Sequence, residues 1–138
     1  MRRIIAAGVV CATLAACAGT DRTTATAAPS AIVGSYVVSS FDGKQLPAAI
    51  AQDSRGAVYL AADTLTINSD GSFTRTGHLR AGADLASATD DGALISAGTV
   101  SGSPDALHFK SGASAFDGAL AGNRLSVTGA VTVVFDKL

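Results

Sequence analysis

Apolar and polar residues alternate along much of this chain, in short stretches separated by Gly, Asp, Asn and Ser. The clearest stretch is TLTINSDGSFTRTGHL, where Leu65 and Ile67 alternate with threonines and Phe73 resumes the alternation after NSDG. Strict alternation is typical of a half-buried β-strand, and an Asp-Gly pair between two such strands favours a tight turn. The stretch therefore predicts a β-hairpin that turns at Asn68–Gly71.

Two later segments repeat one pattern. Gly98–Gly112 (GTVSGSPDALHFKSG) and Gly118–Gly129 (GALAGNRLSVTG) both combine Gly-x-apolar-x-Gly, a turn, and an alternating run that begins with Leu. Each segment predicts one hairpin, and the repeat predicts two successive up-and-down units. The stretch AVTVVFDKL then supplies a last strand.

The same criteria predict eight or nine short strands in the whole chain. They are Val33–Ser40, Ala57–Leu60, Thr64–Asn68, Ser72–Arg80, Leu94–Val100, Ala106–Lys110, Ala115–Leu120, Arg124–Thr128 and Val131–Asp136. So many antiparallel strands in sequential hairpins favour a closed barrel, which leaves no unpaired edges. The predicted fold class is all-β, a small antiparallel up-and-down β-barrel of about eight strands.

Composition agrees with one compact domain. The chain has 138 residues, of which 48% are hydrophobic, and a formal net charge of −1. All 11 acidic residues are Asp, and Trp is absent. Because no basic patch is interleaved with aromatic residues, nucleic acid is not an expected partner.

The N-terminus has the features of an export signal. Two arginines precede the apolar run Ile4–Ala12, which is too short to cross a membrane as a helix. The following LAAC, which ends at Cys17, resembles the cleavage box of bacterial lipoproteins, in which the chain is cut before the cysteine and the cysteine is acylated. The resemblance implies a signal peptide over residues 1–16 and lipidation of Cys17, palmitate included.

Lipidation would anchor the protein to a membrane through the N-terminal acyl chains. Cys11 would leave with the signal peptide, so no disulfide is expected. Residues 17–31 hold the lipidated cysteine and a polar, small-residue tether, and residues 32–138 form the barrel domain. Because Ala18 rather than Asp follows the cysteine, the resemblance implies a cell-envelope protein in the outer membrane, facing the periplasm.

The domain also resembles a known family. GSYVVSSFDGKQLPA, LTINSDGSFTRT, FDGALAGNRLSV and VVF look like successive segments of bacterial lipocalin-like lipoprotein domains. Gly34-Ser35-Tyr36 stands where typical lipocalins have Gly-x-Trp on the first strand. The resemblance implies an eight-stranded calycin-type β-barrel and no common activity.

Alternation assigns a set of apolar side chains to the barrel interior. They are Tyr36, Val38, Leu65, Ile67, Phe73, Leu79, Leu107, Phe109, Phe116, Leu120, Leu125, Val127, Val133 and Phe135. Gly77, Gly98 and Gly118 also fall at inward positions, where they either mark bends or leave room for an apolar cavity.

Arg75 is out of place in this pattern, because it lies in phase with Phe73 and so points inward unless a bulge near Gly77 shifts the register. A buried guanidinium needs an acidic partner or a bound anion. We therefore expect either an anchor for the carboxylate or headgroup of a lipid-like ligand, or a rim arginine that pairs with an Asp or turns to solvent.

Two long connections are candidates for contact with other molecules. Asp42–Ala57 is expected to lie over one mouth of the barrel, with a helical turn from Pro47 and with Leu46 and Ile50 serving as a lid or as a plug. Arg80–Ala93 is expected to be a polar, mobile loop suited to a protein partner.

Two functions fit these patterns. In the first, the barrel binds a small hydrophobic or amphipathic ligand, lined or gated by Tyr36, Leu46, Ile50, Phe73, Arg75 and Phe109. In the alternative, side chains fill the barrel and the protein is an interaction module, such as an envelope assembly factor or an inhibitor of a periplasmic enzyme. A cavity above about 300 Å³ would favour the first function.

Catalysis is not expected. The chain lacks a Gly-x-Ser-x-Gly elbow, a Ser-x-x-Lys pair and a phosphate-binding loop. His78 and His108 fall at outward positions without a third ligand, so neither a metal nor another cofactor is expected.

Overall fold

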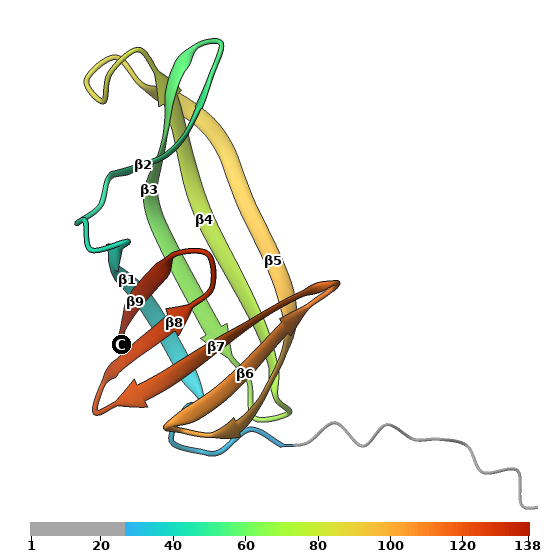
Figure 1. Cartoon of the computed structure of the whole chain (residues 1–138). Helices are drawn as coiled ribbons and strands as arrows, with labels where there is room; N and C mark the ends of the chain where they lie inside the picture. The colour runs from blue at the N-terminus through green and yellow to red at the C-terminus, as the bar shows by residue number, and fades with distance from the viewer. Residues whose placement is uncertain (1–26) are drawn as a thin grey trace, which may run out of the picture.

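The computed structural model describes residues 27–138, and every regular element in this range is a β-strand (Figure 1). The strands are β1 (Gly34–Phe41), β2 (Ala48–Asp53), β3 (Gly56–Ile67), β4 (Ser72–Gly82), β5 (Thr89–Ser103), β6 (Ala106–Ser111), β7 (Ser114–Ala121), β8 (Arg124–Thr128) and β9 (Thr132–Lys137). The predicted fold class is confirmed, since eight of these strands close an antiparallel barrel and one is added to it.

The first strand closes the barrel. β1 pairs with β9 on one side and with residues Thr64–Ile67 of β3 on the other. From β3 to β9 the strands follow in chain order, each antiparallel to the next. β2 is the added strand, because it pairs only with residues Gly56–Leu60 of β3. We call the end of the barrel where β1 ends and β9 begins the upper mouth.

A protruding sheet continues beyond the upper mouth. Figure 1 shows β3, β4 and β5 running past the smaller strands β6 to β9, with β2 alongside. We call this part the extension, residues 48–60 and 77–97. Five of its side chains are buried but do not belong to the main core: Ala48, Val58, Leu60, Ala81 and Ala88.

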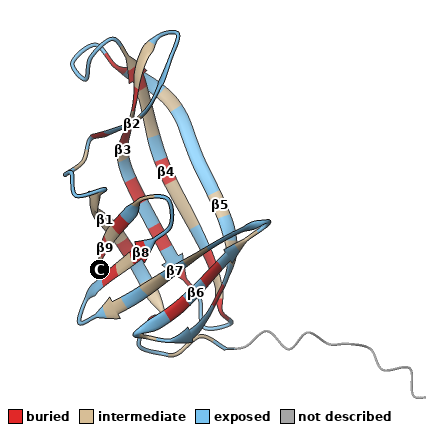
Figure 2. Cartoon of the chain, in the orientation of Figure 1, coloured by how far each residue is buried: buried red, intermediate tan, exposed pale blue. Residues whose placement is uncertain are grey.

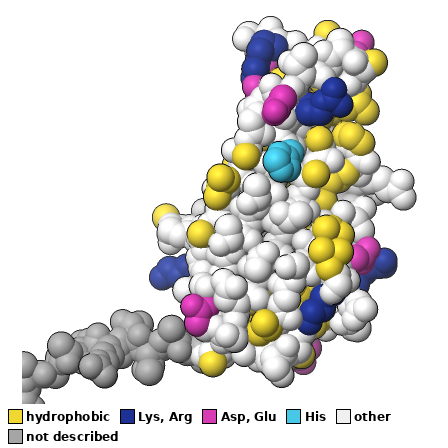
Figure 3. All heavy atoms as spheres, turned by 180° about the vertical axis from the view of Figure 1, so that it is seen from behind, with side chains coloured by type: hydrophobic (Ala, Val, Ile, Leu, Met, Phe, Trp, Pro, Cys, Tyr) yellow, Lys and Arg dark blue, Asp and Glu magenta, His cyan; other side chains and the backbone are white. Residues whose placement is uncertain are grey.

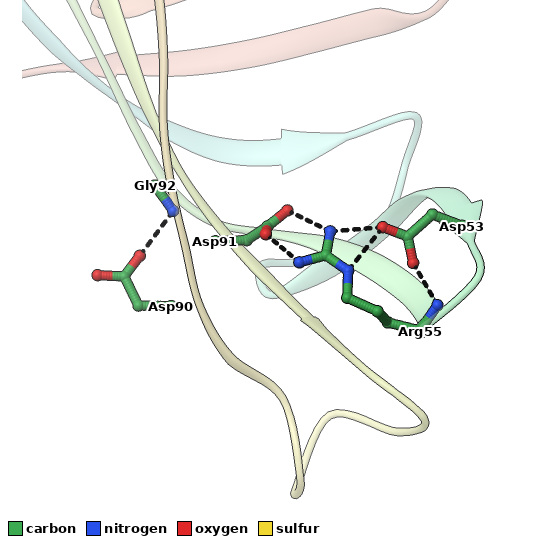
Figure 4. A network of polar contacts seen from close by, with 5 residues as sticks. All are labelled: Asp53, Arg55, Asp90, Asp91 and Gly92. Atoms are coloured by element: carbon green, nitrogen blue, oxygen red, sulfur yellow. Dashed lines mark hydrogen bonds and ion pairs between the residues drawn. The ribbon is translucent and has the colours of Figure 1, made fainter.

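An ion-pair network closes the tip of the extension (Figure 4). Arg55, in the turn between β2 and β3, contacts Asp53 of β2 and reaches Asp91 of β5, with its Nη1 atom 2.5 Å from Asp91 Oδ1. The contact joins the two outer strands of the extension, so its sheet is strongly curled. We call these three residues the tip clamp.

Parts of two segments that were expected to be connections, Asp42–Ala57 and Arg80–Ala93, form strands. The helical turn expected from Pro47 is wrong, because the next residue begins β2. Asp42 and Gly43 have φ angles of 50° and 76° and turn the chain immediately after β1, which leaves the later residues free to pair with the edge of β3. The loop expected over Arg80–Ala93 is also shorter, since β4 and β5 leave only residues 83–88 between them.

The repeated segments form the hairpins that the sequence predicts. Gly98–Gly112 contains the end of β5, a turn and β6, and Gly118–Gly129 contains the end of β7, a turn and β8. The two positive-φ glycines occupy different places: Gly102 (φ 99°) is still in β5 and pairs with Leu107, whereas Gly122 (φ 62°) is the first residue of its turn. The repeat in the sequence is therefore a repeat of hairpins and not of one turn geometry.

The main core lies inside the barrel (Figure 2). All the predicted inward side chains are buried or half-buried, and Val38, Leu79, Phe116 and Leu120 are the half-buried ones. The assignment of Leu79 to the barrel interior is wrong, because Leu79 pairs with Leu60 and Gly92 in the extension and does not belong to the main core. Ile32 and Val100, which the alternation did not assign, are buried with them. The full set in this cluster is Ile32, Tyr36, Leu65, Ile67, Phe73, Val100, Leu107, Phe109, Leu125, Val127, Val133 and Phe135.

Large side chains occupy the space left by the inward glycines. A Cβ atom on Gly98 would lie 2.9 Å from the ring of Phe73, and one on Gly118 would lie 2.9 Å from the ring of Phe109. A Cβ atom on Gly77 would lie 3.0 Å from a methyl group of Leu60. These glycines therefore let large side chains pack closely and do not open a cavity.

The predicted signal peptide, Cys17 and most of the tether lie outside the described residues. The last residues of the predicted tether lie against the barrel: the amide of Ala28 donates to the carbonyl of Ser69 over 3.1 Å, and Lys137 Nζ donates to the carbonyl of Ala31 over 2.7 Å. Within residues 27–138 there is no helix that could cross a membrane.

Candidate functional site

A pocket of about 370 Å³ lies at the upper mouth of the barrel. The end of β1, the start of β7 and the turn between β8 and β9 form its rim, and side chains from inside the barrel form its walls. The lining residues are Phe41, Arg75, Ser114, Ala115, Phe116, Val127, Gly129, Ala130, Val131 and Val133. We call this cavity the mouth pocket.

An aromatic cluster separates the mouth pocket from the rest of the barrel. Phe116 lines the pocket and stacks on Phe109, with ring centroids 5.4 Å apart and an interplanar angle of 10°. Phe73 meets Phe109 edge-to-face at 5.5 Å. Phe73 and Phe109 are buried in the main core, so the three rings lie between the mouth pocket and the other buried side chains.

Arg75 supplies the charged group of the pocket wall. Its Nε atom donates to Asp63 Oδ2 over 2.8 Å, and its Nη2 atom donates to the same oxygen. Its guanidinium carbon lies 5.5 Å from the centroid of the Phe135 ring. The Asp63 side chain is fully buried, whereas that of Arg75 is 21% exposed. The sequence prediction that Arg75 points inward is therefore confirmed, and an Asp is its partner.

The register of the β3–β4 hairpin brings the two charges together. Leu65 pairs with Arg75 and Asp63 with Gly77, so Asp63 is in phase with Leu65 and lies next to Arg75 along the inner face. A bulge with Ala61 as the extra residue of β3 comes only beyond this point, between Leu60 and Ala62.

The ion pair leaves polar atoms unused. Both bonds of Arg75 go to one oxygen of Asp63, and the other, Oδ1, is buried without a hydrogen-bond partner among the described residues. No hydrogen bond from Arg75 Nη1 to another described residue is present. Since a guanidinium carries five N–H groups, Arg75 retains donors for an acceptor placed in the mouth pocket.

The six residues predicted to line or gate a ligand are not brought together. Arg75 lines the mouth pocket, but Tyr36, Phe73 and Phe109 are buried below it in the core. Leu46 and Ile50 are half-buried in the β1–β2 connection and in β2, away from the pocket lining.

Tyr36 has a structural contact of its own. Its hydroxyl donates to the carbonyl of Ile32 over 2.6 Å, and burial raises the pKa of the Tyr36 phenol above its ordinary value. The hydrogen bond of the Tyr36 hydroxyl fixes the segment that leads into β1.

The alternation pattern did not identify several residues of the pocket lining as part of a binding site. Phe116, Val127 and Val133 were assigned to the interior, but only their height in the barrel makes them pocket walls. Phe41 and Val131 stand at strand ends, where alternation gives no direction for a side chain.

The histidines are exposed, as predicted. His108 Nδ1 lies 2.7 Å from Asp117 Oδ1 across the outer face of β6 and β7. Among residues 27–138 no group of three or more His, Cys, Asp or Glu side chains is placed to hold a metal ion.

Comparison with known proteins found no matching family, no similar curated protein and no similar solved structure. The closed antiparallel barrel of eight strands is consistent with a calycin-like fold.

Proposed function

We propose that this protein binds a small amphipathic molecule in the mouth pocket, as a lipocalin-like lipoprotein of the bacterial envelope. Arg75 carries the proposal, because it is a single partly exposed cation with unused donors in a pocket whose other walls are mostly apolar. Such a site matches a ligand with an apolar body and one carboxylate, phosphate or other acceptor group.

The size of the pocket also supports binding. Its volume of about 370 Å³ lies within the range of small-molecule sites, which begins at roughly 300 Å³. Phe116, Phe41 and the valines of β8 and β9 would cover the apolar part of the ligand, and Arg75 would orient its polar end.

The proposal includes a membrane anchor at Cys17 and no enzymatic activity. Lipid on Cys17 would hold the barrel beside the outer membrane, on its periplasmic side, where amphipathic molecules are available. Acyl chains give durable anchoring when two or more are present, because each buried methylene contributes about 0.8 kcal/mol.

Fluorescence titration with two probes tests the pocket. Residues 27–138, which contain every described strand and the core, are titrated with the anionic dye 1-anilinonaphthalene-8-sulfonate and with neutral N-phenyl-1-naphthylamine. We expect saturable binding of one molecule of each dye per chain, with the anion bound more tightly because Arg75 can donate to its sulfonate.

Two sets of variants locate the binding. Arg75→Gln combined with Asp63→Asn removes both charges together, which avoids leaving a buried carboxylate unpaired. The double variant should bind the anionic dye about tenfold more weakly, because a hydrogen bond to a charged group contributes about 1.5 kcal/mol or more. Its affinity for the neutral dye should be unchanged. Val131→Phe fills the pocket and should weaken the binding of both dyes. Val134→Phe, on the outer side of the same hairpin, is its control.

The outcomes separate the two functions. If Val131→Phe no longer binds either dye but Val134→Phe still binds both, the ligand site is the mouth pocket. Equal binding of the anionic dye by the double variant and by the parent would remove Arg75 from the proposal. If a folded parent binds neither dye, the barrel is not a ligand carrier, and the alternative, a protein-interaction module, takes its place.

A further inference from the structure

β5 has a long unpaired edge. β4 pairs with β5 from Thr89 to Thr99, whereas β6 pairs only with Thr99–Ser103. Residues 89–97 therefore have β4 on one side and no paired strand on the other among the described residues. We call this stretch the β5 edge.

A side-chain contact shows which backbone groups point outward. Ser111, at the end of β6, donates from its hydroxyl to the carbonyl of Ala97 over 2.7 Å, so this carbonyl points away from β4. Successive residues of a strand direct their N–H and C=O groups to opposite edges. Ala93 and Ile95, which lie four and two residues before Ala97, therefore also present theirs at the free edge.

The side chains of the β5 edge favour contact with protein. Leu94 and Ile95 are 49% and 68% exposed, and residues 92–97 include neither a charged residue nor a proline. Figure 3 shows hydrophobic side chains at several places on the back of the molecule, among polar atoms. Exposed edges of this kind pair with other strands unless charges, prolines or bulges interrupt them.

The other free edge of the extension is protected. β2 follows Pro47, has only six residues and is interrupted by a bulge at Ile50. Proline and bulges are devices that prevent edge-to-edge pairing. β5 has a bulge of its own at Asp91, so the part of its edge that is open to pairing is the regular stretch after the bulge, residues 92–97, which contains no proline.

We propose that the β5 edge pairs with the β5 edge of a second copy of this chain, antiparallel about a two-fold axis at Leu94. In this register Ala93 lies opposite Ile95 of the second copy, and both residues present their N–H and C=O groups outward. The two Leu94 side chains then meet at a position without ladder hydrogen bonds, where opposite Cα atoms are about 4.5 Å apart.

The same register avoids charge repulsion. The ladder ends before the Asp90-Asp91 pair, because Asp91 is the extra residue of a bulge and Ser111 already bonds the outward carbonyl of Ala97. Neither carboxylate of the pair therefore faces its own counterpart. The contact is identical on both sides of the axis and therefore closes as a dimer instead of growing into a filament. Both exposed Leu94 side chains become covered.

Cysteine cross-linking in the full chain tests the dimer and its register. Leu94→Cys, treated with copper phenanthroline, should give a disulfide-linked dimer, because the two Cα atoms lie within disulfide distance. Ile95→Cys is the matched control: position 95 is more exposed, yet it faces Ala93 of the second copy and not its own counterpart. The parent chain, treated in the same way, is a second control that measures cross-linking through the native Cys11 and Cys17.

The Leu94→Cys dimer band should exceed the Ile95→Cys band severalfold. Adding Ala93→Pro, which removes an outward N–H, should abolish it while an unchanged melting temperature shows that the barrel remains folded. Dimer bands of equal intensity for the two cysteine variants would mean that the cross-link forms by random collision. The absence of a dimer band, or a cross-link to a different protein, would also contradict a second copy of this chain as the partner. Neither result bears on the mouth pocket, because none of its lining residues lies in the β5 edge.

Discussion

At the residue scale, small side chains decide how tightly the barrel closes. Gly98 lies where β5 passes from the extension into the barrel, with Phe73 packed against its face. A Cβ atom there would also lie only 1.9 Å from the carbonyl oxygen of Lys110 on β6. The backbone, and not only a movable side chain, would have to shift to admit it.

Gly98→Ala should therefore lower the free energy of unfolding by about 3 kcal/mol or more, the upper range for overpacking a core. Gly112→Ala is the matched control, because a Cβ atom at Gly112 meets nothing within 4 Å and only its φ angle of 58° opposes the change. Gly112→Ala should lower the free energy of unfolding by only about 1 kcal/mol. Urea denaturation of both variants measures the difference, and equal losses would contradict the close approach of β5 to β6.

At the scale of elements, the tip clamp joins β2 to β5 across the extension. Hydrogen bonds from Arg55 lower the pKa of Asp53 below its ordinary value, and those to Asp91 and Asp53 raise the pKa of Arg55. Because the folded state then releases the Asp53 proton more readily than the unfolded chain, the clamp stabilises the tip at pH values above about 4. This contribution is lost as the pH falls through the lowered pKa of the folded state.

Amide NMR signals of residues 54–56 should therefore broaden or shift between pH 5 and pH 2 before those of the barrel strands. Arg55→Gln should show the same opening already at pH 7, and high salt should weaken the parent clamp because its charges are exposed. Arg124→Gln, which removes an exposed ion pair to Asp136 on the barrel, is the control and should leave the tip unchanged. A tip that stays closed in Arg55→Gln at pH 7 would show that the clamp does not hold it.

At the scale of the whole molecule, the barrel and the extension bury different numbers of apolar side chains. The main core has twelve buried residues, from β1, β3 to β6, β8, β9 and the segment that leads into β1, whereas the extension has five, of which three are alanines. The burial of apolar surface stabilises in proportion to area, at roughly 25 cal/mol per Å². The extension is therefore the less stable part, although its strands are continuous with the barrel.

Hydrogen exchange should resolve this difference. Amides of β8 and β9 should exchange only through global unfolding, whereas those of β2 and of residues 83–92 should exchange through a smaller opening with a weaker dependence on urea. A single exchange free energy across both regions would contradict a separate extension and would indicate one cooperative unit.

The sequence by itself determined most of the strands and which of their side chains face inward, because the two-residue period of a strand is a local property. The turn at Asn68–Gly71, both repeated hairpins and the inward direction of Arg75 were predicted in this way, and the all-β barrel followed from the number and spacing of the strands. Connections were predicted less well, because residues 48–53 and 80–93 pair with neighbours that a local pattern does not identify.

Only the tertiary structure decided where the candidate site lies. Closure of the barrel by β1 on β3 defined the upper mouth, and the register of β3 against β4 set Asp63 beside Arg75. The mouth pocket depends on the height of each inward side chain in the barrel and on strand ends such as Phe41. Height and closure follow from the register between strands far apart in the sequence, and alternation along one strand carries no information about that register.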